Sequence, residues 1–232
     1  MHLFYQPDIS TGILPPEESH HAVKVLRLTP GSLITLADGV GHHHQAVLKD
    51  ISATRVAFQI TSTTHTPKRD FSIHLAIAPT KNIDRIEWLL EKCTEIGVDS
   101  ITPLLCKTSE RKVVNHDRLE KVIISALKQS MQPYKPMLHP LMVFGAFVKQ
   151  PSLPTQRFIA HMGATALSLT KTALPHRDYV ILIGPEGDFT PTEVNLAQEN
   201  KFVSVGLGPS RLRTETAGLM AVVMLNLLQE QA

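Results

Sequence analysis

The sequence predicts an α/β protein with a smaller β-rich part at its N-terminus. The chain has 232 residues, which is enough for one large domain or two small ones. Residues 1–70 contain short apolar segments separated by turn residues, which is typical of antiparallel strands. From residue 71 onward, strand-like segments alternate with helix-like ones. Such alternation indicates a mostly parallel sheet that is covered by helices on both faces.

The composition is that of an ordinary soluble protein, with 43% hydrophobic and 19% charged residues. No apolar run reaches the roughly 18 to 20 residues that a membrane span needs, and the N-terminus does not resemble a signal peptide. Cys93 and Cys106 fit neither a zinc ribbon nor a redox motif, so we expect two reduced, buried thiols in a cytoplasmic protein. The net charge of +2 does not by itself indicate a nucleic-acid-binding protein.

In the first part, residues 15–28 begin with two prolines followed by acidic residues, which predicts a short amphipathic helix. Three strands are predicted after it, at residues 32–38, 42–51 and 54–63, in a meander or small barrel. The polar, proline-containing stretch 61–70 has no apolar period and is predicted to be a linker.

In the second part, strand-like residues 71–79 precede a helix whose apolar residues recur at helical spacing, with Gly97 at its C-cap. A second strand and helix are expected next. The remaining elements follow the same pattern, with strands at 157–162, 178–185 and 202–208 and helices at 190–200 and 214–229. The last helix is apolar on all sides, so we expect it in the core or in a subunit interface.

Three of the loops that follow strands carry glycine: 161–165, 184–188 and 206–211. In open α/β sheets, ligands bind where the carboxyl ends of the strands lead into such loops. Glycine lets the backbone adopt unusual angles or approach a ligand closely. The three loops together predict a shared small-molecule site.

The type of ligand is narrowed by motifs that the sequence lacks. It contains neither the GxxxxGK[ST] phosphate loop nor a GxGxxG dinucleotide fingerprint after a strand. Glu186 and Asp188 would also repel a pyrophosphate group. A cationic or neutral ligand is therefore favoured, and a nucleotide- or NAD-using enzyme is disfavoured.

Two helix starts flank the second and third loops. Thr190, Pro191 and Glu193 form a T-x-x-E capping box with proline at the first helical position. Thr214 is the expected N-cap of the last helix. Arg211 and Arg213 precede that helix, where cations are mildly unfavourable, so they indicate an anionic substrate or a developing negative charge.

Five segments, in this order, resemble motifs of the SPOUT methyltransferases of the RsmE type, which methylate N3 of a uridine in the 16S rRNA of the small ribosomal subunit. The segments are "HHAVKVLRL" (20–28), "EKCTEIGVDSITPL" (91–104), "SALKQS" (125–130), "LIGPEG" (182–187) and "LGPSRLRTETA" (207–217). The similarity spans both parts of the chain, so it is more specific than any single motif.

The resemblance implies a PUA-like RNA-binding β-barrel domain over residues 1–70 and a SPOUT methyltransferase domain with a C-terminal trefoil knot over 71–232. It also implies S-adenosylmethionine as cofactor, ribosomal RNA as substrate and a homodimer, and we expect no metal. A non-catalytic RNA-binding module of ribosome assembly and a methyltransferase of another RNA base remain as alternatives.

Carried over residue by residue, the resemblance implies three cofactor-binding segments. They are His161, Met162 and Gly163; Leu182, Gly184, Pro185, Glu186 and Gly187; and Val205, Leu207, Gly208, Leu212, Arg213 and Thr216. Since uridine N3 carries a proton, methylation also needs a base and a group that stabilises the imide anion. Arg213, and less strongly Arg211, are the candidates for stabilising the anion, and Glu215 is a candidate base or orienting group.

The candidate RNA contacts are basic residues in both parts of the chain, although each of them also fits an ordinary charged surface. They are His21, Lys24, Arg27, Arg111, Lys112, Lys128 and Lys135. Among the three consecutive histidines His42 to His44, neighbours in a strand point to opposite faces, so no complete metal site is expected.

The sequence departs from the family pattern at two positions. Asp188 stands where the family usually has the second glycine of GPEGG, and Gln132 stands near an expected arginine. Aspartate tolerates left-handed backbone angles, so we favour replacement of glycine with little strain. The other interpretation is that the carboxylate turns inward toward the cofactor's sulfonium or amino group.

Overall fold

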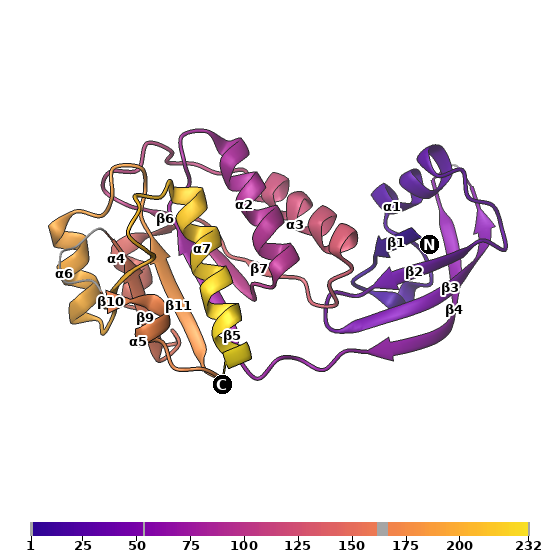
Figure 1. Cartoon of the computed structure of the whole chain (residues 1–232). Coiled ribbons are helices and arrows are strands. Elements are labelled where there is room, and N and C mark those ends of the chain that lie inside the picture. The colour runs from indigo at the N-terminus through magenta and orange to yellow at the C-terminus, as the bar shows by residue number, and fades with distance from the viewer. Residues whose placement is uncertain (1, 53, 162–166, 232) are drawn as a thin grey trace. The chain divides into compact units, whose positions relative to one another are not determined.

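The computed structural model describes residues 2–52, 54–161 and 167–231 (Figure 1). The chain divides into two compact units. The first unit comprises residues 1–68 and 124–135, and the second comprises residues 69–123 and 136–232. No helix in the described part of the chain is long and apolar enough to cross a membrane.

The first unit contains one four-stranded sheet in the order β1-β2-β3-β4. Its strands are β1 (His2–Tyr5), β2 (Leu33–Ala37), β3 (His42–Ile51) and β4 (Val56–His65). The expected antiparallel meander of β2, β3 and β4 is confirmed. Strand β1, which pairs in parallel with β2, was not expected. Because β4 continues to His65, the prediction that residues 61–65 belong to a linker is wrong.

The helix predicted at residues 15–28 is present in two segments. They are α1 (Pro16–His20) and a π-helical turn, η2 (His21–Val25). A short 3-10 turn, η1 (Ile9–Thr11), precedes α1. Phe4, Leu14 and Ala22 pack with the inner faces of the strands into the core of this unit.

The second unit is built on an eight-stranded sheet in the order β10-β12-β9-β11-β5-β6-β7, with β8 also paired to β6. Every pairing in this sheet is parallel, so the predicted α/β fold is confirmed. The elements are β5 (Ser72–Ile77), α2 (Ile83–Ile96), β6 (Ser100–Leu105), α3 (His116–Ser130), β7 (Met137–Leu138), β8 (Met142–Val143), α4 (Phe144–Val148), β9 (Gln156–Ala160), β10 (Leu167–Ser168), α5 (Leu169–Thr172), β11 (Asp178–Ile183), α6 (Pro191–Glu199), β12 (Val203–Gly206), α7 (Thr214–Leu227) and η3 (Leu228–Gln231).

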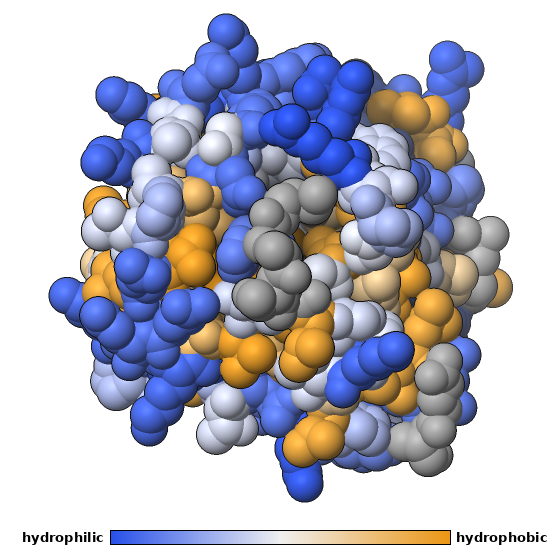
Figure 2. All heavy atoms as spheres, turned by 60° about the vertical axis from the view of Figure 1, so that its left-hand side comes forward, coloured by the Kyte–Doolittle hydropathy of each residue, from blue (hydrophilic) through white to orange (hydrophobic). Residues whose placement is uncertain are grey.

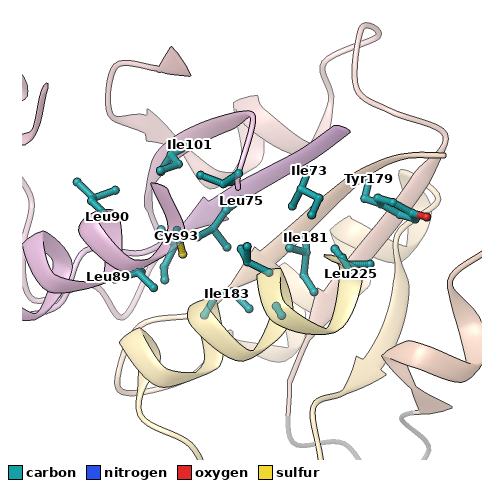
Figure 3. Close-up of a cluster of buried hydrophobic side chains, with 14 of the residues drawn as sticks. Ile73, Leu75, Leu89, Leu90, Cys93, Ile101, Tyr179, Ile181, Ile183 and Leu225 are labelled. Carbon is teal, nitrogen blue, oxygen red and sulfur yellow. The ribbon is translucent and has the colours of Figure 1, made fainter. Parts of the chain in front are cut away.

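Side chains of each central strand enter two separate apolar layers. Ile181 and Ile183 of β11 point toward α7, where Leu225 lies opposite them (Figure 3). Val180 and Leu182, which alternate with them, pack in the second layer with residues of α4 and α6. The sheet is therefore covered on both faces, as the alternation of strand-like and helix-like segments predicted.

The two cysteines lie one in each layer and are both free and buried. Burial raises the pKa of the Cys106 thiol to about 12 and also raises the pKa of Cys93 above its ordinary range. Both therefore have the character of inert, reduced core thiols.

Helix α7 lies alongside α2 on one face of the sheet (Figure 1). Gly218 of α7 allows this close approach, because a Cβ atom there would lie 2.8 Å from Cδ1 of Ile77 and 3.1 Å from Cδ2 of Leu89. The predicted burial of α7 is confirmed for the face that carries Gly218, Ala221 and Leu225.

Replacing Gly218 with alanine tests this packing. We expect Gly218→Ala to be less stable than the matched variant Gly145→Ala by about 1–3 kcal/mol, because only the former overpacks the core. At Gly145, a Cβ atom would lie at an ordinary 3.6 Å from Leu196. Chemical denaturation measures both free energies of unfolding. Equal stabilities of the two variants would contradict the packing argument.

Candidate active site

The sheet order brings the starts of the three glycine-bearing loops together. Strands β12, β9 and β11 are neighbours and run parallel, so their carboxyl ends lie at one edge of the sheet. At this edge is a cavity of about 460 Å³, a volume within the range of small-molecule sites. The cavity is lined by Arg85, Ala160, His161, Ile183, Gly184, Pro185, Glu186, Asp188, Val205, Gly206, Leu207, Gly208, Ser210, Arg211, Leu212, Arg213, Thr214, Glu215 and Ala217.

Most of the residues that the resemblance implied for the cofactor line this cavity. They are His161, Gly184, Pro185, Glu186, Val205, Leu207, Gly208, Leu212 and Arg213. Arg211 and Glu215 line it too. Leu182, Gly187 and Thr216 do not: the Leu182 side chain lies in the core, and Gly187 lies beside Thr108. Met162 and Gly163 lie outside the described residues.

The loop after β11 is held by its own hydrogen bonds. The Asp188 N–H donates to the carbonyl of Pro185 at 2.9 Å, which closes a turn. Asp188 has a left-handed φ of 62°, and its Oδ1 accepts a hydrogen bond from the N–H of Phe189 at 2.7 Å. The aspartate therefore adopts the backbone conformation that glycine would have, and its side chain caps the neighbouring peptide.

Helix α6 begins directly after this loop, with the predicted capping box. The Thr190 side chain accepts from the N–H of Glu193 at 3.3 Å, and Glu193 Oε2 accepts from the N–H of Thr190 at 2.9 Å. The other oxygen of Glu193 accepts from the N–H of Lys107 at 2.8 Å. The cap of α6 thus also fixes the loop that follows β6.

Glu186 connects the loop after β11 to the loop after β5. Its Oε1 accepts a hydrogen bond from the backbone N–H of Lys81 at 2.9 Å. The Lys81 ammonium pairs with Glu110 at 2.9 Å, which raises the pKa of this lysine. Arg111 donates through Nε to the carbonyl of Thr80 at 3.0 Å, so its guanidinium also holds this loop.

The start of α7 differs from the expectation by one residue. The N-cap is Arg213, not Thr214, because the carbonyl of Arg213 accepts the first helical bond from the N–H of Ala217 at 2.8 Å. Thr214 is buried in the first turn, while Arg211 and Arg213 are exposed at the cavity. The first N–H groups of a helix lack acceptors within it and form its positive end.

Glu215 is the buried carboxylate of the cavity. Only 8% of this residue is exposed, and its Oε2 has no hydrogen-bond partner among the described residues. Its Oε1 lies 3.9 Å from Nε of Arg85, which is on the first turn of α2. Arg85 was not among the site residues predicted from the sequence. The signal that could have found it is that α2 begins after β5, whose carboxyl end neighbours that of β11.

His161 stands at the end of β9 with a defined ring position. Its Nε2 and the Oγ of Ser204 lie 2.9 Å apart, and the Gln198 side chain donates to the same Oγ at 3.1 Å. The ring is therefore oriented by groups on β12 and α6 at the wall of the cavity.

The candidate RNA-contacting residues differ in their surroundings. In the first unit, Lys24 and Arg27 are exposed, while Lys128 pairs with the buried Glu18 at 2.7 Å. In the second unit, Lys112 is exposed. His21 and Lys135 are partly buried in the first unit. Lys128 therefore already has a structural role as the partner of a buried carboxylate.

Histidines of the first unit are held by hydrogen bonds. Asp38 is mostly buried, but hydrogen bonds from the N–H groups of Val40 and His42 and from the His42 ring keep its pKa below the ordinary value.

Among residues 2–52, 54–161 and 167–231, no group of three or more His, Cys, Asp or Glu residues is placed to hold a metal ion.

Comparison with known proteins gives two family matches. A family described as "RNA methyltransferase domain" matches residues 67–226, and one described as "RNA methyltransferase PUA domain" matches residues 14–61. Two proteins named ribosomal RNA small subunit methyltransferase E are similar along most of the chain. The one from Rickettsia conorii is 26% identical, covering 90% of this chain and 86% of its own. The one from Synechocystis is 30% identical, covering 95% and 74%.

Solved structures give the same result. A probable rRNA methyltransferase from Porphyromonas gingivalis is 37% identical with a TM-score of 0.91, covering 100% of this chain and 99% of its own. A ribosomal RNA small subunit methyltransferase E from Neisseria gonorrhoeae, bound to S-adenosyl methionine, is 31% identical with a TM-score of 0.85 and 98% coverage of both chains.

Substitution of Asp188 separates the two interpretations of this residue. We expect Asp188→Gly to change the free energy of unfolding by less than about 1 kcal/mol, because glycine adopts a positive φ without strain. Asp188→Val places a β-branched residue at that angle and is expected to cost about 1–3 kcal/mol. Urea denaturation of both variants checks this. If the two were equally destabilised, the carboxylate rather than the backbone angle would be decisive.

Proposed function

The chain belongs to the RNA methyltransferase family, and we propose that it transfers a methyl group from S-adenosylmethionine to N3 of a uridine in 16S rRNA. The observation that carries this proposal is the cavity at the shared strand edge, which is lined by described residues that follow β9, β11 and β12, beside two arginines and a buried carboxylate. The gonococcal relative, whose structure contains S-adenosyl methionine, supports the cofactor. The names of the curated relatives support the small-subunit RNA as substrate.

The cavity has the chemistry that this cofactor needs. It combines apolar side chains with backbone groups of glycine-bearing loops and has no phosphate-binding motif. We propose that all the residues implied by the resemblance bind the cofactor. The set includes Leu182, Gly187 and Thr216, which do not line the cavity, and Met162 and Gly163, which lie outside the described residues. When bound, S-adenosylmethionine supplies an electrophilic methyl group on a sulfonium.

Residues of the chain then have to remove the proton of uridine N3 and stabilise the negative charge of the resulting imide anion. We assign Glu215 to accept the N3 proton, and Arg213, with Arg211 beside it, to stabilise the charge that develops on O2 and O4. The N3–CH₃ bond forms as the S–CH₃ bond breaks, and the proton remains on the carboxylate until water takes it. Holding N3 in line with the methyl group supplies a further part of the rate.

For the organisation of the chain, we propose that residues 1–70 form a PUA-like RNA-binding barrel and that residues 71–232 form a SPOUT domain with a trefoil knot. The match of residues 14–61 to a PUA family supports the first assignment. The position of β12 between β10 and β9, out of chain order, supports threading of the C-terminal segment.

In the first unit, the exposed Lys24 and Arg27 are the best-placed candidates for contacts with RNA phosphates. His21, Lys128 and Lys135 stay in the proposed set for this unit, and Arg111 and Lys112 for the second. We expect the target base to be unstacked from its neighbours before it reaches the cavity.

We also propose a homodimer. Apolar side chains gather in groups on the face that Figure 2 shows, and the exposed apolar residues of the second unit include Leu167, Val203 and Leu227. Trp88 on α2 is 42% exposed, which supports an interface position. Because the proposed substrate is ribosomal RNA, we place the protein in the cytoplasm.

The site of methylation tests the proposed function directly. We expect unmodified small ribosomal subunits, incubated with the protein and labelled S-adenosylmethionine, to acquire label on N3 of a single uridine of 16S rRNA. Mass spectrometry of nuclease fragments locates it. Label on another base would refute the uridine assignment, and absence of both label and S-adenosylhomocysteine binding would favour a non-catalytic RNA-binding module.

The role of Arg213 is tested by Arg213→Ala. We expect methylation to slow by about 10²–10³-fold, because a donor to the developing anion is lost. Because Arg213 is also in the proposed cofactor-binding set, the rates are compared at saturating S-adenosylmethionine, and calorimetry measures the affinity of each variant for S-adenosylhomocysteine. Arg177→Ala is the control, since this exposed arginine precedes β11 at the opposite edge of the sheet. An unchanged rate in Arg213→Ala would remove Arg213 from the mechanism.

A further inference from the structure

We propose that Arg85 and Glu215 form a pair that selects uracil, in which Glu215 accepts the N3–H and Arg85 donates to a neighbouring carbonyl oxygen of the base. This inference rests on the proposed function and deepens it, because it names the group that sets base specificity. Arg85 is absent from the motifs by which the sequence was interpreted.

The first observation is the unfilled hydrogen-bonding capacity of Glu215. Its Oε2 is buried and has no partner among the described residues, although the side chain lines the cavity. Buried carboxylate oxygens are costly unless a donor reaches them. The positive end of α7 explains why an acid is tolerated in its first turn, but it does not supply that donor. A ligand in the cavity that carries a hydrogen-bond donor would supply it to Oε2 of Glu215.

The second observation is the position of Arg85. Its Nε is 3.9 Å from Oε1 of Glu215, which is close enough for an ion pair and too long for a hydrogen bond. In the described part of the chain, the guanidinium has no hydrogen-bond acceptor, and 40% of the side chain is exposed. A guanidinium has five N–H donors in a planar fork, so they remain available to a ligand at the cavity.

Together the two side chains present an acceptor beside a set of donors. The edge of uracil carries the complement, an N3–H donor between the carbonyl oxygens O2 and O4. Cytosine has a lone pair on N3 in place of the N–H. In this site two hydrogen-bond acceptors, N3 and the carboxylate, would then face each other without water, so cytosine is rejected. The same carboxylate takes the N3 proton first, and Arg85 offsets the negative charge that the imide anion then carries. The N3–CH₃ bond forms afterwards as the S–CH₃ bond breaks, which leaves the methylated base neutral.

The experiment compares Glu215→Gln, Arg85→Met and Arg85→Lys with the full-length parent. The substrates are unmodified small subunits with the natural target uridine, and subunits in which that uridine is replaced by cytidine. Single-turnover incorporation of labelled methyl gives the rate on each, and calorimetry gives the affinity for S-adenosylhomocysteine. Glu199→Gln and Arg177→Met serve as matched controls, because both residues are exposed and neither lines the cavity.

We expect Glu215→Gln to slow methylation of uridine by about 10²–10⁴-fold, the usual contribution of a general base. Cytosine N3 needs no deprotonation, and an amide can donate to it, so the uridine-to-cytidine rate ratio should fall by about tenfold or more. Arg85→Met should slow uridine methylation by roughly 10–100-fold, as for a lost hydrogen bond to a charged group. Arg85→Lys, which keeps the charge without the planar fork, should recover part of this rate.

A purely structural role would lower stability but leave the uridine-to-cytidine ratio unchanged, and that result would overturn the inference. Loss of S-adenosylhomocysteine affinity in Glu215→Gln would also overturn it, because the carboxylate would then hold the cofactor. If the parent protein labels a base other than uracil, the proposed function itself fails. If the parent labels uridine N3 and the variants keep its ratio, only the pair is refuted.

Discussion

The parallel pairing of β12, β9 and β11 is the constraint on which the site depends. Their hydrogen-bond registers align the ends of the three strands, so loops that are far apart in the sequence open at the same edge. The two apolar layers fix the sheet from both sides, and this rigid edge lets short loops hold a defined geometry.

The electrostatics of this edge are divided between its two sides. On one side, Asp188 caps a peptide of its own loop, and Glu186 accepts the backbone N–H of Lys81 in the neighbouring loop, so both acids take part in holding loops. On the other side, Arg211 and Arg213 are exposed beside the positive end of α7. Glu215 is buried there, and its Oε2 meets no hydrogen-bond partner within the described part of the chain. The acids on the β11 side therefore hold loops in place, whereas the exposed arginines and the buried Glu215 lie on the α7 side.

Much of this organisation was predictable, because it depends on local patterns. A few neighbouring residues determine each of three features: the T-x-x-E capping box of α6, the glycine that ends α2, and the alternation of strands and helices. The left-handed angle at Asp188 was predictable for the same reason. The relation of Arg85 to Glu215 was not, because 130 positions of sequence separate two helices that only tertiary packing brings together. Strand β1 escaped prediction since its partner, β2, lies across an intervening helix.

The hydrogen bond between Glu186 and the backbone of Lys81 has a consequence for how this edge tolerates change. The Glu186 carboxylate links the segments after β5 and β11 by a hydrogen bond. Glu193 links the segments after β6 and β11 in the same way. The segment after β11 is therefore held by hydrogen bonds to two neighbouring loops. The residues that donate these bonds, Lys81 and Lys107, do not line the cavity. Because Lys81 and Lys107 donate through their backbone N–H groups, both positions are compatible with many side chains, whereas proline, which has no N–H, would remove these hydrogen bonds.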